Sequence, residues 1–161
     1  MSNNYVTDNL VIENAEILFR NFSGAQSQYN PKGSRNFCVI IPSDDLAEKL
    51  SSDGWNVKYL QPREEGDPAR PYIQVRVSFS GRPPIIKMIT SSGQTMLDEH
   101  TINMLDYADI SNVDLIVGPY NWNVNGKSGV KGYVRSMYVT IREDEFAAKY
   151  ATPSPDDIPF K

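Results

Sequence analysis

Tyr72-Ile73-Gln74-Val75-Arg76-Val77-Ser78-Phe79 is the stretch of sequence that decides the fold class. Apolar and polar residues alternate strictly along it. Successive side chains of a β-strand point to opposite faces, so one face here is entirely apolar. The other face carries Tyr72, Gln74, Arg76 and Ser78, which include an aromatic ring and a cation. The pattern is typical of a strand in an antiparallel sheet that buries one face and exposes the other.

Strand signals continue on both sides of this stretch. Segments rich in β-branched and aromatic residues, bounded by turn formers, cover 9–20, 35–41, 55–60, 85–90, 113–124 and 130–141. Asn125-Gly126 separates the last two segments and favours a tight hairpin turn, which residues 127–129 would lengthen. Trp55 and Tyr59 share a face of their segment with Val57, so we expect both rings in the core.

Two helices are expected between the strands. The first begins after Ser43 as N-cap and ends at Gly54, and the second covers about 98–107. The strands are too irregularly spaced for repeated βαβ units. The sequence therefore predicts a mainly β fold, a small barrel with two short inserted helices.

Length and composition limit the class of protein. The chain has 161 residues, which fits one domain, and its 40% hydrophobic and 22% charged residues are normal for a globular protein. A single cysteine, Cys38, and a single histidine, His100, argue against disulfides, a metal centre and most acid–base catalysis. We therefore expect no enzyme, cofactor or metal. Since no long apolar run or secretion signal is present, we expect a soluble cytoplasmic protein with no membrane contact.

Charge is sorted along the chain, although the net charge is −4. Segments 17–43, 68–97 and 115–141 contain ten Lys and Arg residues and no acid, whereas the acids lie between these segments or at the two ends of the chain. The basic segments coincide with predicted strands, which suggests a basic face for a polyanion. The alternative is that a mixed surface shows such blocks by chance.

The last eleven residues differ from the rest. Prolines at 153, 155 and 159 prevent a regular helix or strand, so we expect a domain over 1–150 and a disordered acidic tail over 151–161. The tip of this tail suits a linear motif whose Phe enters a pocket while the carboxylates meet a basic rim on a partner. It consists of Asp156, Asp157, Ile158, Pro159 and Phe160.

Two stretches and the tip resemble known families. The tip is similar to the acidic end of bacterial single-stranded DNA-binding proteins, although Lys161 follows the Phe here, so the pocket that reads it would differ. The body resembles the OB-fold single-stranded DNA-binding proteins of tailed phages in Asn14-Ala15-Glu16-Ile17-Leu18-Phe19-Arg20-Asn21-Phe22 and in Gly132-Tyr133-Val134-Arg135-Ser136-Met137-Tyr138-Val139. This resemblance implies an OB-fold-like barrel that wraps single-stranded DNA. It also implies a tail that docks replication or repair proteins, in the cytoplasm of a bacterial host.

Aromatic and basic residues interleave on the last predicted hairpin, as a single-strand site requires. Tyr120 and Trp122 share one face of its first strand, and Lys131, Tyr133 and Arg135 share one face of its second. The alternative is ordinary aromatic packing in a barrel core. Further candidates are Lys127 in the turn region, Tyr72 with Arg76, and four residues around loop 21–34 that could close over DNA or belong to a mobile loop: Arg20, Phe22, Lys32 and Arg35.

The resulting hypothesis is a non-enzymatic protein that binds and protects single-stranded DNA without sequence preference, in phage DNA replication, recombination or repair. The alternative is an adaptor of the replication machinery that acts through its tail. A nuclease on a β scaffold is the least favoured hypothesis. The preference between DNA and RNA and the formation of a homo-oligomer stay open.

Overall fold

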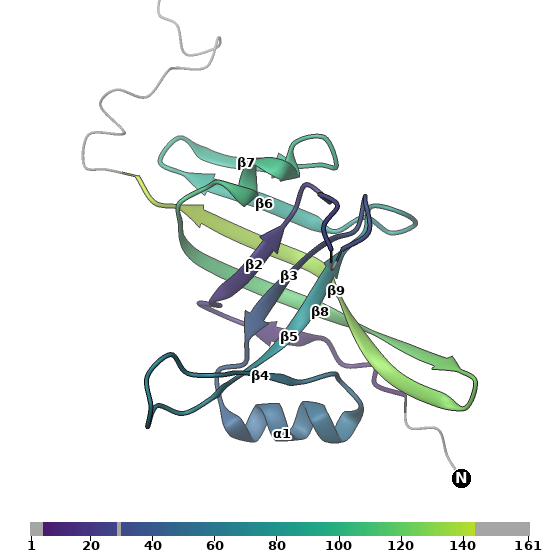
Figure 1. Cartoon of the computed structure of the whole chain (residues 1–161). Helices are drawn as coiled ribbons and strands as arrows, with labels where there is room; N and C mark the ends of the chain where they lie inside the picture. Colours follow the sequence, from purple (N-terminus) through teal and green to yellow (C-terminus); the bar gives the residue numbers. More distant parts are fainter. Residues whose placement is uncertain (1–4, 29, 144–161) are drawn as a thin grey trace, which may run out of the picture.

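One branched sheet contains all nine strands of the described residues, which are 5–28 and 30–143 of this computed structural model (Figure 1). The mainly β prediction is confirmed. The strands are β1 Leu10–Ile12, β2 Ile17–Asn21, β3 Arg35–Ile40, β4 Lys58–Leu60, β5 Arg70–Val77, β6 Ile85–Thr90, β7 Gly93–Leu97, β8 Ile110–Val124 and β9 Lys127–Ile141. In these described ranges, no helix is long and apolar enough to cross a membrane.

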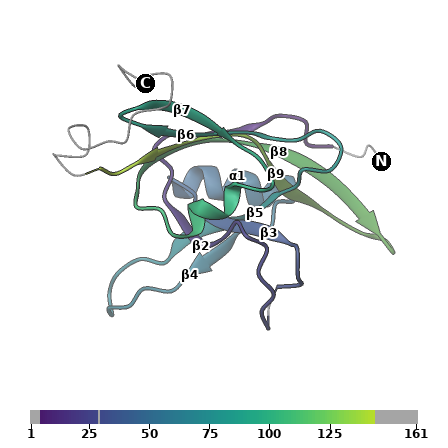
Figure 2. The same ribbon diagram turned by 90° about the horizontal axis from the view of Figure 1, so that it is seen from above.

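The sheet runs in the order β1-β8-β9-β5-β3-β2 and does not close into the predicted barrel. β4 pairs with β5, and the β6–β7 hairpin joins β9. β9 is parallel to both β5 and β6, whereas its pairing with β8 is antiparallel. Figure 2 shows the β6–β7 hairpin on one side of the molecule and β4 on the other.

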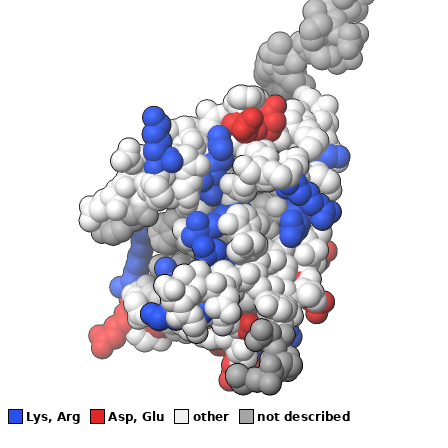
Figure 3. Space-filling view, turned by 90° about the vertical axis from the view of Figure 1, so that its right-hand side faces the viewer, with Lys and Arg blue, Asp and Glu red and all other residues white. Residues whose placement is uncertain are grey.

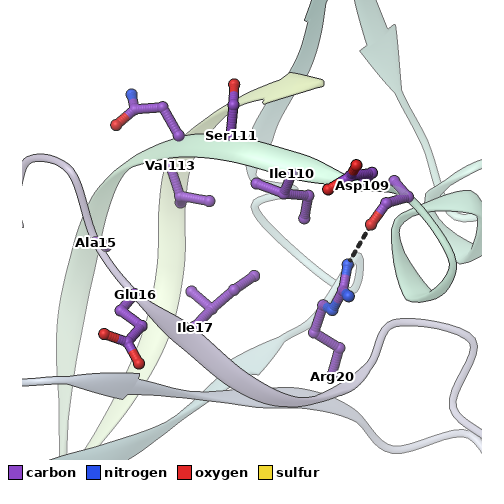
Figure 4. Close-up of a pocket in the computed structure, with 10 residues that line it drawn as sticks. Ala15, Glu16, Ile17, Arg20, Asp109, Ile110, Ser111 and Val113 are labelled. Carbon is purple, nitrogen blue, oxygen red and sulfur yellow. Dashed lines mark hydrogen bonds between the residues drawn. The ribbon is translucent and has the colours of Figure 1, made fainter. Parts of the chain in front are cut away.

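The gap in the sheet lies between β2 and β8. The predicted strand over 9–20 is broken because Asn14 has a φ of 53°, so β1 pairs with β8 and β2 with β3. Across the gap, the Ala15 N–H donates to the Val113 carbonyl at 2.7 Å. The hollow that remains has a volume of about 450 Å³, and Ile17 and Ile110 point into it (Figure 4).

The strand β5 carries the alternation that the sequence predicts. Ile73, Val75 and Val77 are buried, whereas Tyr72, Gln74 and Arg76 keep contact with solvent. β5 pairs with β3 from Tyr72 to Val77 and with β9 at Val75 and Arg76. The strand therefore links the two halves of the sheet.

The β8–β9 hairpin turns at Asn125-Gly126, as the sequence predicts. Both residues have positive φ angles, 52° and 80°, and Val124 pairs directly with Lys127, so the loop has two residues only. A β-bulge shifts the register between Ile116 and Val117. It reverses the inside–outside alternation of β9, which explains why both Val134 and Met137 are buried.

The first helix, α1 (Asp44–Asp53), forms as predicted. The Ser43 hydroxyl accepts the Leu46 N–H at 3.1 Å, and Gly54 ends the helix with a φ of 104°. Ala47 and Leu50 face the core. The caps and the apolar face that are visible in the sequence are therefore sufficient to predict this helix.

The prediction of a second α-helix is wrong. The described chain has a short 3-10 helix, η1 (Ile102–Asp106), where the sequence predicts an α-helix over 98–107. The Asp98 carboxylate accepts the N–H groups of His100 and Thr101, and so holds the first residues of that segment in a turn. The helical part of the predicted segment is therefore limited to the five residues of η1, of which Ile102 and Leu105 are buried.

Two predictions about the aromatic residues of segment 55–60 have different outcomes. Trp55 is buried, as expected, but Tyr59 is 50% exposed and not part of the core. The reason is that β4 has three residues only and lies beside one end of β5, where the core does not extend. β7 is not predicted from the sequence, because its first four residues are all exposed and show no strand alternation.

Candidate nucleic-acid interface

Most of the candidate residues lie on one surface, the outer face, which we define as the side of β5, β8 and β9 opposite the core. On the hairpin, Tyr120 pairs with Lys131 and Trp122 with Gly129. Tyr133 pairs with Arg76 of β5, which extends this face to a third strand. The face contains eight of the predicted residues: Tyr72, Arg76, Tyr120, Trp122, Lys127, Lys131, Tyr133 and Arg135.

The orientation of the Trp122 indole depends on a glycine. A Cβ at Gly129 would lie 2.8 Å from the Trp122 Cζ2, so the indole packs directly against the backbone of β9. In the same way, a Cβ at Gly118 would overlap the Arg135 Nε, so the guanidinium stem crosses β8 at that point. Two glycines thus hold a ring and a cation against the sheet.

Trp122 borders a groove, the Trp122 groove, with a volume of about 420 Å³. One wall is the end of α1 and the residues after it, which the bond from the Val130 N–H to the Gly54 carbonyl (3.0 Å) fixes to β9. Arg76 and Lys131 are the charged residues of the lining, and none of its described residues is acidic. The remaining lining residues are Ser51, Gly54, Trp55, Asn56, Gln74, Ser128, Gly129 and Val130.

A pair of tyrosines lies next to this groove. The rings of Tyr120 and Tyr133 meet edge to face, with 5.9 Å between their centroids. Tyr120 is 56% exposed, so part of its ring area is open to solvent. Exposed aromatic faces beside cations offer both contacts that a single-stranded nucleic acid needs, base stacking and phosphate attraction.

The segregation of charge that the sequence suggests persists in space. Of the ten cations in the three basic segments, only Arg70 forms an ion pair with a described carboxylate, that of Glu16. Figure 3 shows the side toward which the β8–β9 hairpin projects. Lys and Arg are spread over this side, whereas Asp and Glu lie mainly toward its lower and right-hand edges, with one acidic group near the top. The charges of the other nine cations are therefore not neutralised by an ion pair with a described carboxylate.

Phe22 does not lie on this surface. It is fully buried and packs against Phe37, with 5.2 Å between the ring centroids, and its N–H donates to the Asp106 carboxylate at 2.6 Å. The expectation that this ring faces a ligand is therefore corrected. Phe22 is a core residue because the chain turns inward after β2.

The two arginines around loop 21–34 have structural contacts. Arg20 donates to the Leu105 and Ala108 carbonyls at 2.9 and 2.8 Å, beside the hollow between β2 and β8 (Figure 4). Arg35 donates to the Phe22 and Glu99 carbonyls and lies 5.5 Å from the centroid of the Phe79 ring. Lys32 is exposed. The loop therefore contributes Lys32 as its accessible cation, and the tail residues Asp156, Asp157, Ile158, Pro159 and Phe160 lie outside the described residues.

The role of Gly118 and Gly129 is not predicted from the sequence, although a signal for the contact of Gly129 with Trp122 exists. Once Val124 is paired with Lys127 across a two-residue turn, counting outward pairs Trp122 with Gly129. The role of Asn121 is not predicted either: its side chain accepts the Val6 N–H at 3.0 Å and donates to the Val6 carbonyl at 2.8 Å. This contact with residues before β1 has no local signal in the sequence.

Gly129→Ala is expected to displace the Trp122 indole. The new methyl group would meet rigid ring atoms at 2.8–2.9 Å, so the indole must move, at a cost of about 1–3 kcal/mol in stability. Tryptophan emission and urea denaturation measure both effects. Gly118→Ala is the control, because the flexible Arg135 can swing aside and leave the emission unchanged. Equal emission spectra for Gly129→Ala and the unchanged protein would contradict the account of this contact.

The described residues contain no group of three or more His, Cys, Asp and Glu positioned to hold a metal ion. Burial raises the pKa of the Cys38 thiol, which is 9% exposed. The outer face offers aromatic rings that can stack on bases and cations that can attract anions.

Comparison with known families identifies the class of protein. Residues 1–160 match the family described as "Putative phage ssDNA-binding domain". The chain therefore belongs to this family of phage single-stranded DNA-binding domains. No curated protein matches the sequence.

Solved structures with a similar fold come from the same class. The single-stranded DNA-binding protein from bacteriophage Enc34 in complex with ssDNA is 9% identical, with a TM-score of 0.56 over 84% of this chain and 88% of that chain. A second structure of the Enc34 protein is 11% identical, with a TM-score of 0.53 over 92% of this chain and 88% of that chain. At such identities the similarity concerns the fold.

Proposed function

We propose that the chain binds single-stranded DNA on its outer face, without sequence preference, and protects it during phage DNA replication, recombination or repair. The observation that carries the proposal is the Trp122 groove, where an aromatic ring and two cations line a surface free of described carboxylates. Family membership and the likeness to the Enc34 protein in complex with ssDNA support the same ligand.

The mechanism that we propose combines two kinds of contact. Arg76 and Lys131 attract phosphates, and bases stack on Trp122 and on the tyrosine pair next to it. A duplex hides the faces of its bases, so it can use the cations but not the rings. In this proposal the curved open sheet acts as an OB-type platform, and the protein performs no covalent chemistry.

Fluorescence anisotropy with a labelled oligothymidine and a duplex of equal length tests this function. We expect preferential binding of the single strand, and an affinity that falls with salt at a slope of about 0.7 per neutralised phosphate. Similar affinities for oligomers of the other bases would agree with stacking. Absence of binding, or binding that salt does not change, would contradict the proposal.

The tail over 151–161 is, in this proposal, a separate unit that contacts replication or repair proteins and competes with DNA for the cations. The charge segregation in the sequence motivates this idea. Deletion of 151–161 should then tighten DNA binding, and Asp156→Asn with Asp157→Asn should reproduce part of the effect. Unchanged or weaker binding would count against competition. An adaptor that acts through the tail alone would instead keep its partner and show no affinity for DNA.

A further inference from the structure

A second hollow, the Phe19 hollow, lies at the β2 end of the sheet, away from the Trp122 groove. Its volume is about 630 Å³. Apolar side chains from β2 and from the β4–β5 connection form much of its wall, and Arg63 lies on its rim. The lining residues are Glu16, Leu18, Phe19, Leu60, Gln61, Pro62, Arg63, Asp67, Pro68 and Arg70.

Phe19 is held in this hollow by an unusual backbone. Its φ is +53°, in the left-handed region that bulky residues rarely adopt, and the register of β2 and β3 shifts between Leu18 and Asn21. The ring is 63% exposed. Such strain persists only where the surroundings enforce it, and it is concentrated at functional sites. The bulge thus turns Phe19 outward, whereas Phe22 goes to the core.

The Phe19 ring continues the outer face. It meets the Tyr72 ring edge to face, with 6.4 Å between the centroids. Tyr72 shares the exposed side of β5 with Gln74 and Arg76, and both of those residues line the Trp122 groove. The four-residue step from Arg76 to Tyr72 spans about 13 Å along a strand. A chain of aromatic and basic residues therefore crosses the sheet from the hairpin to β2.

The charges at the rim allow a phosphate to approach. The negative charge of Glu16 is paired there, because Arg70 bonds both of its carboxylate oxygens at 2.6 and 3.0 Å and lowers its pKa. Arg63 is exposed, and Lys58 pairs with Tyr72 in the register of β4 and β5. Asp67 is the other carboxylate of the lining, where Arg63 offsets its charge, and Lys58 adds a cation beside Tyr72 outside the lining.

We infer that the Phe19 hollow binds a nucleobase of the same DNA strand, with Phe19 and Tyr72 as its stacking surface and Arg63 and Lys58 near its phosphates. This inference rests on the proposed function and extends it, since it assigns a second base site and a path for the strand across β5. The competing occupant is the apolar side chain of a bound protein segment. The continuity with the outer face favours the base.

Phe19→Ala tests the inference with two ligands of equal length: an oligothymidine and an abasic deoxyribose-phosphate oligomer. We expect a loss of about 5- to 150-fold in affinity for the oligothymidine, the range for one lost base stack, and no change for the abasic oligomer. Tyr59→Ala removes a similarly exposed ring from β4 outside the outer face and should change neither affinity.

Phe19→Trp in a Trp122→Phe background supplies a direct signal when compared with Trp122→Phe alone, whose one tryptophan, Trp55, is buried but lines the Trp122 groove. Oligothymidine should quench the new indole. If the unchanged protein binds DNA but Phe19→Ala binds oligothymidine equally well and the new indole is not quenched, the second site is refuted while the proposed function stands. If the unchanged protein binds no DNA, both fail. An equal loss for both ligands would show that Phe19 supports the fold and contacts no base.

Discussion

Trp122→Ala lowers the affinity for single-stranded DNA by about 5- to 150-fold if Trp122 stacks a base, since one stack contributes about 1–3 kcal/mol. The expectation follows from the position of the indole, which packs on Gly129 and borders a groove with Arg76 and Lys131. Fluorescence anisotropy with a labelled oligothymidine measures the loss. The slope of affinity against salt should stay unchanged, because no cation is removed.

Two variants control this experiment. Trp122→Phe keeps an aromatic face and should recover part of the affinity. Tyr107→Ala removes a ring that is 91% exposed but follows η1 and belongs to none of the strands of the outer face, and it should bind as the unchanged protein does. If Trp122→Ala is folded and binds single-stranded DNA with full affinity, no base stacks on Trp122 and the binding site lies elsewhere.

Phe22→Ala is expected to destabilise the protein by about 3–5 kcal/mol, the usual cost of removing a buried ring. Phe22 is fully buried against Phe37, and its N–H is fixed by Asp106. Urea denaturation measures the change. Phe22→Leu fills part of the space and should cost less.

A substitution at Phe22 also distinguishes the binding residue that the sequence predicts from the core residue that the structure shows. If the residue belongs to the core, Phe22→Leu should bind single-stranded DNA with unchanged affinity wherever it is folded. A variant of full stability with weakened binding would instead restore Phe22 to the binding surface and contradict its burial.

Local features of the fold can be predicted from the sequence because their causes are local. The alternation in β5, the Asn125-Gly126 turn and the caps of α1 at Ser43 and Gly54 each depend on a few neighbouring residues. The residues that share the outer face of the hairpin can be predicted from its turn. A two-residue turn determines every cross-strand residue pair of β8 and β9 up to the first β-bulge. The turn therefore accounts for Tyr120, Trp122, Lys127, Lys131 and Tyr133, whereas Arg135 lies in the bulge and Tyr72 and Arg76 belong to β5. Contact of all eight candidate residues with DNA stays a prediction.

The failures have nonlocal causes. The β-bulge at Phe19 changes which side chains after it point toward the core. An uninterrupted strand alternation would therefore place the Phe22 ring on the exposed side, although it is buried. Arg20 and Arg35 bond carbonyls that lie 64–88 residues away in sequence, which charge patterns cannot reveal. The open edge between β2 and β8 depends on a break at Asn14, and although asparagine adopts a positive φ more readily than most residues, its presence does not by itself predict one.

Intrinsic fluorescence tests the central claim most directly, because the chain has two tryptophans and only Trp122 lies on the outer face. The protein is titrated with polythymidine and with a matched duplex at low and moderate salt, alongside Trp122→Phe as control. The account predicts strong quenching by the single strand that salt weakens, weak quenching by the duplex, and loss of the signal in Trp122→Phe. Binding of the single strand without any change in Trp122 fluorescence would contradict it.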